Sequence, residues 1–159
     1  MKKFKVYLIF FLCLVYQNTL ASKIEIKLKV DNEIITNQDI VDEANYLISM
    51  NKSLNQISKK DIYKISLQSL IKEKIKYLEV IKYYDVNSEN EKLNELVLSN
   101  LLSQYRVNNK QDLEKLFSKL KLNMDEVNTK IKIEVFWKKL IFDKYISKVS
   151  INKTKLKEK

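Results

Sequence analysis

Residues 61–86 constrain the fold of this chain more than any other stretch, because their apolar positions recur at helical spacing. On a helix of 100° per residue, one sector about 100° wide collects most of these apolar side chains. The sector holds Tyr63, Leu67, Leu70, Ile71, Leu78 and Ile81. Ile75 and Val80 lie outside it, so we expect this helix to contact neighbours on more than one side. Ser58 followed by Asp61 resembles a capping box that starts the helix, and we expect it to run to about residue 84.

The segment before this helix predicts a β-hairpin followed by a shorter helix. Residues 24–30 alternate strictly between apolar and charged side chains, which is the pattern of a half-buried strand. Asp31 and Asn32 form a turn pair, and residues 33–36 make a second short strand. Thr36 followed by Asp39 is a helix-start signal, so we expect a helix to about Met50.

Three further helices are predicted after residue 86. Each begins with a cap residue followed three positions later by an acidic or amide side chain. The pairs are Ser88 with Glu91, Asn108 with Gln111, and Asn123 with Glu126. The expected buried side chains of the first two are Leu93, Val97, Leu101, Leu113, Leu116, Phe117 and Leu120. The predicted fold is mainly α, with about five helices packed around the long helix and a small N-terminal hairpin, which a strand at 149–151 could join.

The N-terminal segment has the organisation of a secretory signal peptide. Residues 1–5 are basic, residues 6–16 are apolar, and Thr19 and Ala21 occupy the small-residue positions of a cleavage site before Ser22. An apolar run of this length is shorter than the span of about 20 residues that a bilayer requires. We therefore expect a signal peptide at 1–21, a helical domain at 22–151, a charged tail at 152–159 and a periplasmic location. The alternative is an uncleaved membrane anchor; after cleavage no stable membrane span is expected.

Several kinds of chemistry are excluded by residue types that the chain lacks. It contains no Gly, no Pro and no His. Catalytic triads and imidazole metal sites need histidine, and phosphate-binding loops need glycine. The single cysteine, Cys13, lies in the predicted signal peptide. We therefore expect no enzyme, no cofactor, no metal site and no catalytic residue.

The net charge of +10 raises the question of nucleic acid or anionic membrane as a partner. Almost all the positive charge is lysine, interleaved with acidic residues along the predicted helices, and Arg106 is the only arginine. This pattern is typical of a solvated surface. No nucleic-acid partner is expected.

The last predicted helix is apolar on two nearly opposite faces. One face comprises Val127, Ile131, Val135, Phe142, Tyr145, Ile146 and Val149. The other comprises Ile133, Phe136, Trp137 and Leu140. Either both faces belong to the core, or the face with Phe136, Trp137 and Leu140 contacts a partner. Tyr83, Tyr84 and Tyr105 are further candidate contacts.

The order and spacing of these segments resemble the N-terminal domain of the SurA family of periplasmic chaperones. The matching positions are 31–40, Leu67, 70–75, Glu79, Gln104, Val107, Asp112, Leu113, Leu116 and 131–135. The resemblance covers about residues 23–151. It implies a non-catalytic module that binds unfolded polypeptides, with outer-membrane proteins as the expected clients.

The chain departs from the family pattern after this region. Family members continue into parvulin isomerase domains and a C-terminal segment that packs onto the N-terminal domain, whereas this sequence ends at Lys159. A peptidyl-prolyl isomerase is therefore the less favoured alternative, and a structural or adaptor subunit of an envelope complex is the stronger one. Because the apolar surface would lack that segment, we expect a homodimer at high concentration.

Overall fold

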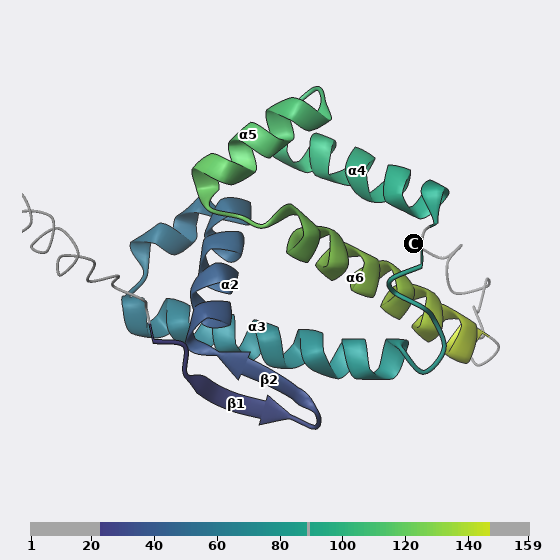
Figure 1. Cartoon of the computed structure of the whole chain (residues 1–159), viewed down its shortest axis with the longest axis horizontal. Coiled ribbons are helices and arrows are strands. Elements are labelled where there is room, and N and C mark those ends of the chain that lie inside the picture. Colours follow the sequence, from purple (N-terminus) through teal and green to yellow (C-terminus); the bar gives the residue numbers. More distant parts are fainter. Residues whose placement is uncertain (1–22, 89, 147–159) are drawn as a thin grey trace, which may run out of the picture.

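The computed structural model describes residues 23–88 and 90–146, which form a β-hairpin followed by helices. The elements, labelled in Figure 1, are β1 (Ile26–Val30), β2 (Glu33–Thr36), α2 (Asn37–Met50), the 3-10 helix η1 (Lys52–Gln56), α3 (Lys59–Val80), α4 (Glu91–Tyr105), α5 (Lys110–Leu120) and α6 (Met124–Tyr145). The prediction of a mainly helical chain with a small N-terminal hairpin is confirmed. The predicted signal peptide, the strand at 149–151 and the tail at 152–159 lie outside the described residues.

The two longest helices, α3 and α6, lie side by side and run in the same direction (Figure 1). Ion pairs between Glu73 and Lys130 and between Lys76 and Glu134 fix this alignment. Two parallel neighbours need a long connection, and α4 and α5 supply it. The helix predicted to be central is α3, which packs against α2, β1 and α6. No helix among residues 23–88 and 90–146 is long and apolar enough to cross a membrane.

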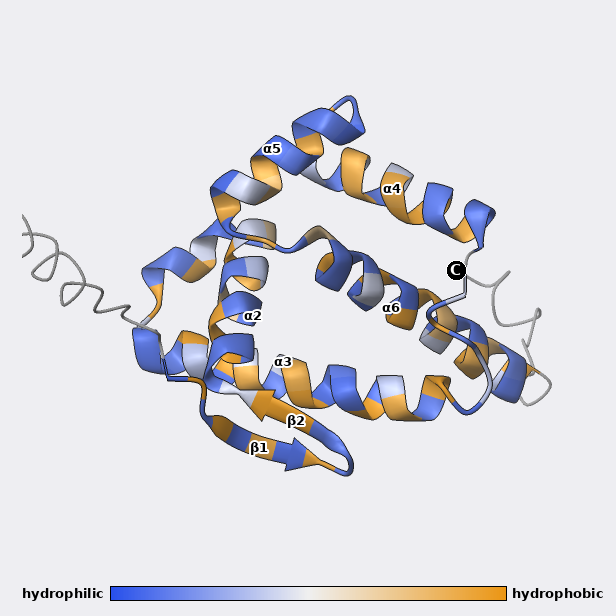
Figure 2. Ribbon diagram, viewed as in Figure 1, coloured by the Kyte–Doolittle hydropathy of each residue, from blue (hydrophilic) through white to orange (hydrophobic). Residues whose placement is uncertain are grey.

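Three clusters of buried side chains form the interior. The largest joins α4, α5 and the start of α6 through Leu93, Val97, Leu101, Leu113, Phe117 and Val127. A second joins the hairpin, α2 and α3 through Ile35, Ile40 and Leu70. In Figure 2 the apolar positions form separate bands along each helix, as expected for helices with a buried side. The predicted burial of Leu93, Val97, Leu101, Leu113 and Phe117 is confirmed; Leu116 and Leu120 are only partly buried.

The end predicted for α3, near Tyr84, is wrong, because the helix ends at Val80. The chain turns at residues 81–83, and this turn brings Val86 back against Val80 and Ile133 in the third buried cluster. Because the helix ends at Val80, the side chains of Val80 and Val86 are both buried against Ile133 of α6. A helix that continued straight would carry Val86 away from Ile133.

Side-chain caps start every α-helix in the described chain. Thr36 accepts a hydrogen bond from the Asp39 N–H (3.2 Å), while its own N–H donates to the Asp39 carboxylate (2.7 Å), which confirms the predicted cap. Ser58 and Asn123 also cap α3 and α6 as predicted. The predicted caps Ser88 and Asn108 are wrong, because Asn90 and Asn109 take those positions. The segments before α4 and α5 each contain two closely spaced residues that could cap the helix, and sequence spacing alone does not choose between them.

The predicted single buried face of residues 24–30 is wrong, because Ile24, Ile26 and Leu28 are exposed and only Val30 is partly buried. Ile26 lies opposite Thr36, while Leu28 lies opposite Ile35, so two steps along β1 match one step along β2. This β-bulge places Leu28 on the inner face with the buried Ile35 but turns Ile26 to the outer face. A shift of one residue exchanges the two faces of a strand, so strict alternation in sequence misassigned Ile26.

Helices α4 and α5 both end in a left-handed residue, although the chain has no glycine. At the end of α4, Arg106 has φ 55°, its N–H donates to the Ser103 carbonyl, and the Val107 N–H donates to the Leu102 carbonyl (3.0 Å). Lys121 has φ 57° in the same arrangement at the end of α5. This is the Schellman motif, in which glycine is the usual left-handed residue.

We expect Arg106→Gly to raise the free energy of unfolding by about 0.5–1 kcal/mol, because glycine avoids the steric cost of a left-handed backbone. Urea denaturation followed by circular dichroism measures the change. The control is Glu95→Gly at an exposed position inside the same helix, which should lower the stability by about 0.5–1 kcal/mol. A loss of stability in Arg106→Gly would contradict the prediction.

Candidate functional site

A groove runs between the C-terminal halves of α3 and α6 and reaches the turn of the hairpin. It encloses about 810 Å³. Its lining comprises Asp31, Asn32, Ile75, Leu78, Glu79, Ile81, Lys82, Trp137, Leu140, Ile141, Lys144 and Tyr145. This volume falls within the range of about 300–1,000 Å³ that small-ligand pockets occupy, and it would hold a few side chains of a bound peptide.

The walls of the groove are apolar and open to solvent. Ile75 from α3 and Ile81 just after it are exposed, as are Ile141 and Tyr145 from α6. Leu140 is buried in the floor, and Trp137 is half-buried beside it. Because α3 and α6 each contribute exposed isoleucine side chains to one concave surface, the groove is suited to contact with apolar groups.

The charges at the edge of the groove are largely paired with one another. The Lys82 ammonium donates to the Glu79 carboxylate at 2.7 Å, and Lys144 lies 3.6 Å from the other Glu79 oxygen. The hydrogen bond from Lys82 lowers the pKa of Glu79, and the same bond raises the pKa of Lys82. Exposed pairs of this kind add little stability. These charged side chains keep the edge of the groove hydrated, while the surface inside the groove is apolar.

The structure divides the predicted contact face of α6 between two environments. Trp137 and Leu140 line the groove. Phe136 and Trp137 both pack against the buried Val80–Val86–Ile133 cluster, but Phe136 does not line the groove, and its ring stacks on Tyr84 with centroids 5.0 Å apart. Of the three residues predicted to contact a partner on this face, only Trp137 and Leu140 are therefore placed to do so in the groove.

The three candidate tyrosines occupy different places. Tyr83 is exposed beside the groove, with the Lys144 ammonium 6.0 Å from its ring centroid. Tyr84 is partly buried under Phe136, and its hydroxyl donates to Asp143 at 3.2 Å. Tyr105 lies away from the groove, hydrogen-bonded to Ser49 at 2.8 Å and edge-on to Phe117, and burial raises its pKa. Tyr105 is thus part of the packing between α2, α4 and α5.

Ile75 and Ile81 are groove residues that the sequence analysis did not single out. Ile81 belonged to the stripe expected in the core, and it is exposed because α3 ends just before it. Ile75 lay outside that stripe. Val80 also lay outside that stripe and is fully buried, so a position off the core face of the helix did not by itself mark a groove residue.

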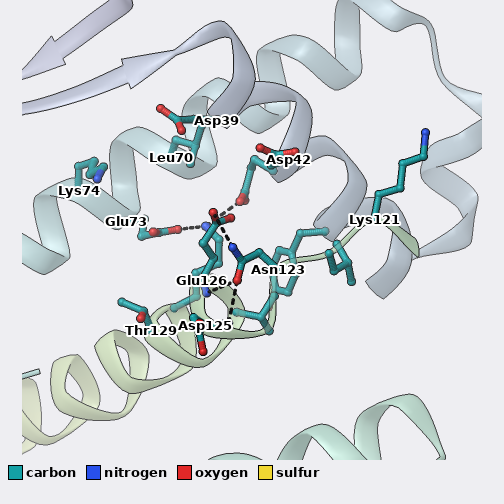
Figure 3. Close-up of a pocket in the computed structure, with 15 residues that line it drawn as sticks. Asp39, Asp42, Leu70, Glu73, Lys74, Lys121, Asn123, Asp125, Glu126 and Thr129 are labelled. Atoms are coloured by element: carbon teal, nitrogen blue, oxygen red, sulfur yellow. Dashed lines mark hydrogen bonds and ion pairs between the residues drawn. The ribbon is translucent and has the colours of Figure 1, made fainter. Parts of the chain in front are cut away.

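A second cavity, of about 510 Å³, lies between α2, α3 and the start of α6, and six of its 15 lining residues are acidic (Figure 3). Its acidic lining is Asp39, Asp42, Glu43, Glu73, Asp125 and Glu126. The Lys130 ammonium lies 2.7 Å from the Glu43 carboxylate, pairs with Glu73, and sits 5.6 Å from the centroid of the Tyr46 ring. Lys130 thus links α2, α3 and α6 at one point.

Burial and the neighbouring charges shift the pKa values of Lys130, Glu126 and Tyr46 in this cavity. Burial lowers the pKa of Lys130, but Glu73 and Glu43 outweigh that effect, so the net shift is upward and the ammonium stays charged. Burial, followed by the neighbouring Asp42, raises the pKa of Glu126. Burial also raises the pKa of Tyr46 to about 12. Glu43 is buried, and its carboxylate pairs with Lys130, which also pairs with Glu73. This triad of Lys130, Glu43 and Glu73 connects α6 to α2 and α3.

The acidic lining does not amount to a metal site. Within the part of the chain that the structure describes, no group of three or more His, Cys, Asp or Glu side chains is arranged to hold a metal ion. The groove between α3 and α6 is therefore the candidate site for function. Searches against protein-family models, curated proteins and solved structures find no match to this chain.

Proposed function

We propose that this chain is a non-catalytic, chaperone-like module that binds apolar segments of unfolded polypeptides in the groove between α3 and α6. The observation that carries the proposal is the exposure of Ile75, Ile81 and Ile141 on one concave surface beside Trp137. Exposed apolar side chains gathered in a groove commonly mark a binding site for a protein partner.

The energetics favour a flexible, apolar occupant. The three isoleucines are 37–53% exposed, so covering each one would contribute about 0.5–1.5 kcal/mol, and ordering the bound segment offsets part of this gain. The paired charges of Glu79, Lys82 and Lys144 at the edge remain hydrated during binding. Affinity would then depend on apolar area rather than on one specific side chain, which suits a carrier of varied clients.

The proposed location and clients rest on the sequence. The arrangement of residues 1–21 supports export to the periplasm. The resemblance to the SurA family supports outer-membrane proteins as the clients. No residue is assigned a catalytic role, and prolyl isomerisation is not part of the proposal.

Residues 22–159 should suppress the aggregation of an unfolded β-barrel protein, as measured by light scattering. Ile81→Asp should weaken client binding by about tenfold or more, because it removes apolar burial and adds a charge that must be desolvated. The matched control is Val41→Asp on α2: Val41 is 53% exposed and Ile81 43%, but Val41 does not line the groove. Equal suppression by the Ile81→Asp protein and the wild type would contradict the proposal.

The fluorescence of Trp137 provides an independent measurement of client binding, because Trp137 is the only tryptophan and lines the groove. Its emission should shift to the blue when an unfolded client covers the groove.

Sedimentation of the protein without client tests whether a second copy covers the groove instead, as expected for a homodimer at high concentration. Pull-down from the periplasm separates the alternatives: many unfolded clients indicate a chaperone, and one stoichiometric partner indicates an adaptor subunit.

A further inference from the structure

One apolar face of α6 leaves the core before the helix ends. Along this face Val127 is buried, and Ile131 and Val135 pack against the cluster that joins α4 and α5. Two turns further on, Phe142 is 60% exposed and Ile146, at the C-terminal cap, is 50% exposed. The helix therefore carries a continuous apolar side that α4 and α5 cover only in its first half.

This uncovered end of α6 is distinct from the groove. Neither Phe142 nor Ile146 lines the groove. Ile133 and Leu140 lie nearly opposite Phe142 on the helix, and both are buried. Figure 1 shows this end of α6, in yellow, at the margin of the molecule. Half or more of the Phe142 and Ile146 side chains thus remains exposed in the part of the chain that the structure describes.

Positive charge is concentrated at the same end of the chain. Residues 138–159 contain eight lysines and only two acids, so they supply +6 of the net charge of +10. Lys139 is balanced by Asp143, 2.7 Å away. The excess comes mainly from Lys138, which has no ion-pair partner among residues 23–88 and 90–146, and from the five lysines that follow Ile146 in the sequence.

This charge decides between the possible occupants of the uncovered face. A second copy would bring the same lysines, and residues 147–159 carry five lysines against one acid. Like charges brought together are unfavourable, so both occupants are disfavoured. A nucleic acid would attract the lysines, but it offers no apolar phase for Phe142. An anionic bilayer offers both, because its headgroups attract lysine and its acyl chains accept apolar side chains.

We propose that the C-terminal end of α6 binds the surface of an anionic lipid bilayer. Phe142 and Ile146 enter the boundary between headgroups and acyl chains. Lys138 lays its aliphatic stem beside them and keeps its ammonium at the level of the headgroups. The lysines that follow Ile146 add electrostatic attraction to the same lipids.

This inference goes beyond the proposed function and does not depend on it. The bilayer contact uses Phe142 and Ile146, whereas client binding uses the groove between α3 and α6. Suppression of aggregation is measured without lipid, and the bilayer contact is measured without a client. Failure of one proposal therefore leaves the other standing.

The test is co-sedimentation of residues 22–159 with lipid vesicles. Residues 1–21 are omitted because an apolar leader would bind lipid by itself, and every described element lies within 23–146. Vesicles of equal parts phosphatidylglycerol and phosphatidylcholine should bind at least about tenfold more tightly than phosphatidylcholine vesicles. Raising the salt concentration to about 0.5 M should weaken this binding, because salt screens the lysines. Equal binding to both kinds of vesicle, or binding to neither, would overturn the proposal.

Matched variants connect the binding to the end of α6. Phe142→Asp should weaken it by about tenfold or more, since it removes apolar burial. Val41→Asp adds the same charge at a similarly exposed apolar position on α2, and it should change the binding by less than about threefold. Circular dichroism checks that both variants fold. Equal weakening by the two variants would show that charge alone binds the vesicles, and this would overturn the proposal.

A fluorescent reporter tests insertion without relying on the folding of Phe142→Asp. In a Trp137→Phe background, Phe142→Trp should shift its emission to the blue when phosphatidylglycerol vesicles are added, and an unchanged emission would overturn the proposal. Two further results would assign the face to another occupant and also overturn it. One is a dimer that Phe142→Asp dissociates and that does not bind vesicles. The other is binding to a DNA duplex or to polyglutamate that is as tight as binding to vesicles and equally sensitive to Phe142→Asp.

Discussion

Replacing Lys130 by methionine should lower the free energy of unfolding by about 3–5 kcal/mol at neutral pH, because it strands a buried charge. Lys130 is the cation that lies against the buried Glu43 carboxylate, 2.7 Å away, and it also pairs with Glu73. Methionine fills a similar volume, so the loss reports the charge rather than a cavity. Urea denaturation followed by circular dichroism measures the change.

A double variant distinguishes the charge effect from simple loss of packing. Lys130→Met combined with Glu43→Leu removes both members of the buried pair, and most of the stability should return. Matched controls come from Lys139, which forms an exposed pair with Asp143 at 2.7 Å. Lys139→Met should change the stability by less than about 1 kcal/mol. A loss below about 1 kcal/mol in Lys130→Met would show that the triad does not hold α6 in place.

The pH dependence of the same variants follows from the direction of the Lys130 shift. The folded-state pKa of Lys130 is raised above its ordinary value of 10.5. The stability from this group is therefore fully present below about pH 10.5 and is lost as the pH rises through the folded-state value. The free energy of unfolding of Lys130→Met should therefore approach that of the wild type as the pH rises through the folded-state pKa of Lys130, because the wild type then loses the same positive charge.

Phe117→Ala should lower the free energy of unfolding by about 3–5 kcal/mol, because it opens a cavity in the largest buried cluster. Phe117 is 2% exposed and packs with Leu101, Leu113 and Val127, while the ring of Tyr105 meets it edge-on at 5.0 Å. The cluster joins α4, α5 and α6, so the substitution should weaken the packing of all three helices. Thermal and urea denaturation should report the same cooperative transition.

The control for this prediction is the same substitution at an exposed position. Phe142 on α6 is 60% exposed, so Phe142→Ala should change the stability by about 0.5 kcal/mol or less. Equal losses in the two variants would mean that Phe117 is not part of the core. Tyr105 gives a second measurement, because its ring contacts Phe117 and its hydroxyl is hydrogen-bonded to Ser49. Removing the Phe117 ring should let Tyr105 move, which its fluorescence would report.

Local patterns in the sequence were sufficient for most helices. Leu93, Val97 and Leu101 recur at the helical period, and they lie on one buried side of α4. Thr36, Ser58 and Asn123 were recognisable as caps, because a cap depends only on atoms within a few residues. Where neighbouring asparagines competed, as at Asn108 and Asn109, the local pattern had no basis for choosing.

Long-range packing decided features that no local pattern contains. The sequence showed Glu43 as one of many acidic residues, but folding places it beside Lys130, which lies far along the chain, and that pairing permits its burial. The end of α3 depended on Val86 meeting Ile133, and the exposure of Ile81 followed from it. The groove could not be foreseen for the same reason.

The sequence by itself determined the elements of this protein: a hairpin, amphipathic helices and the caps that start several of them. It did so because periodicity and capping act over a few residues and are written directly in the order of side chains. The tertiary structure alone decided the parallel pairing of α3 and α6, the register of the hairpin and the burial of Glu43 beside Lys130. These depend on which distant side chains meet, and the energy of each contact exists only once the chain has brought its partners together.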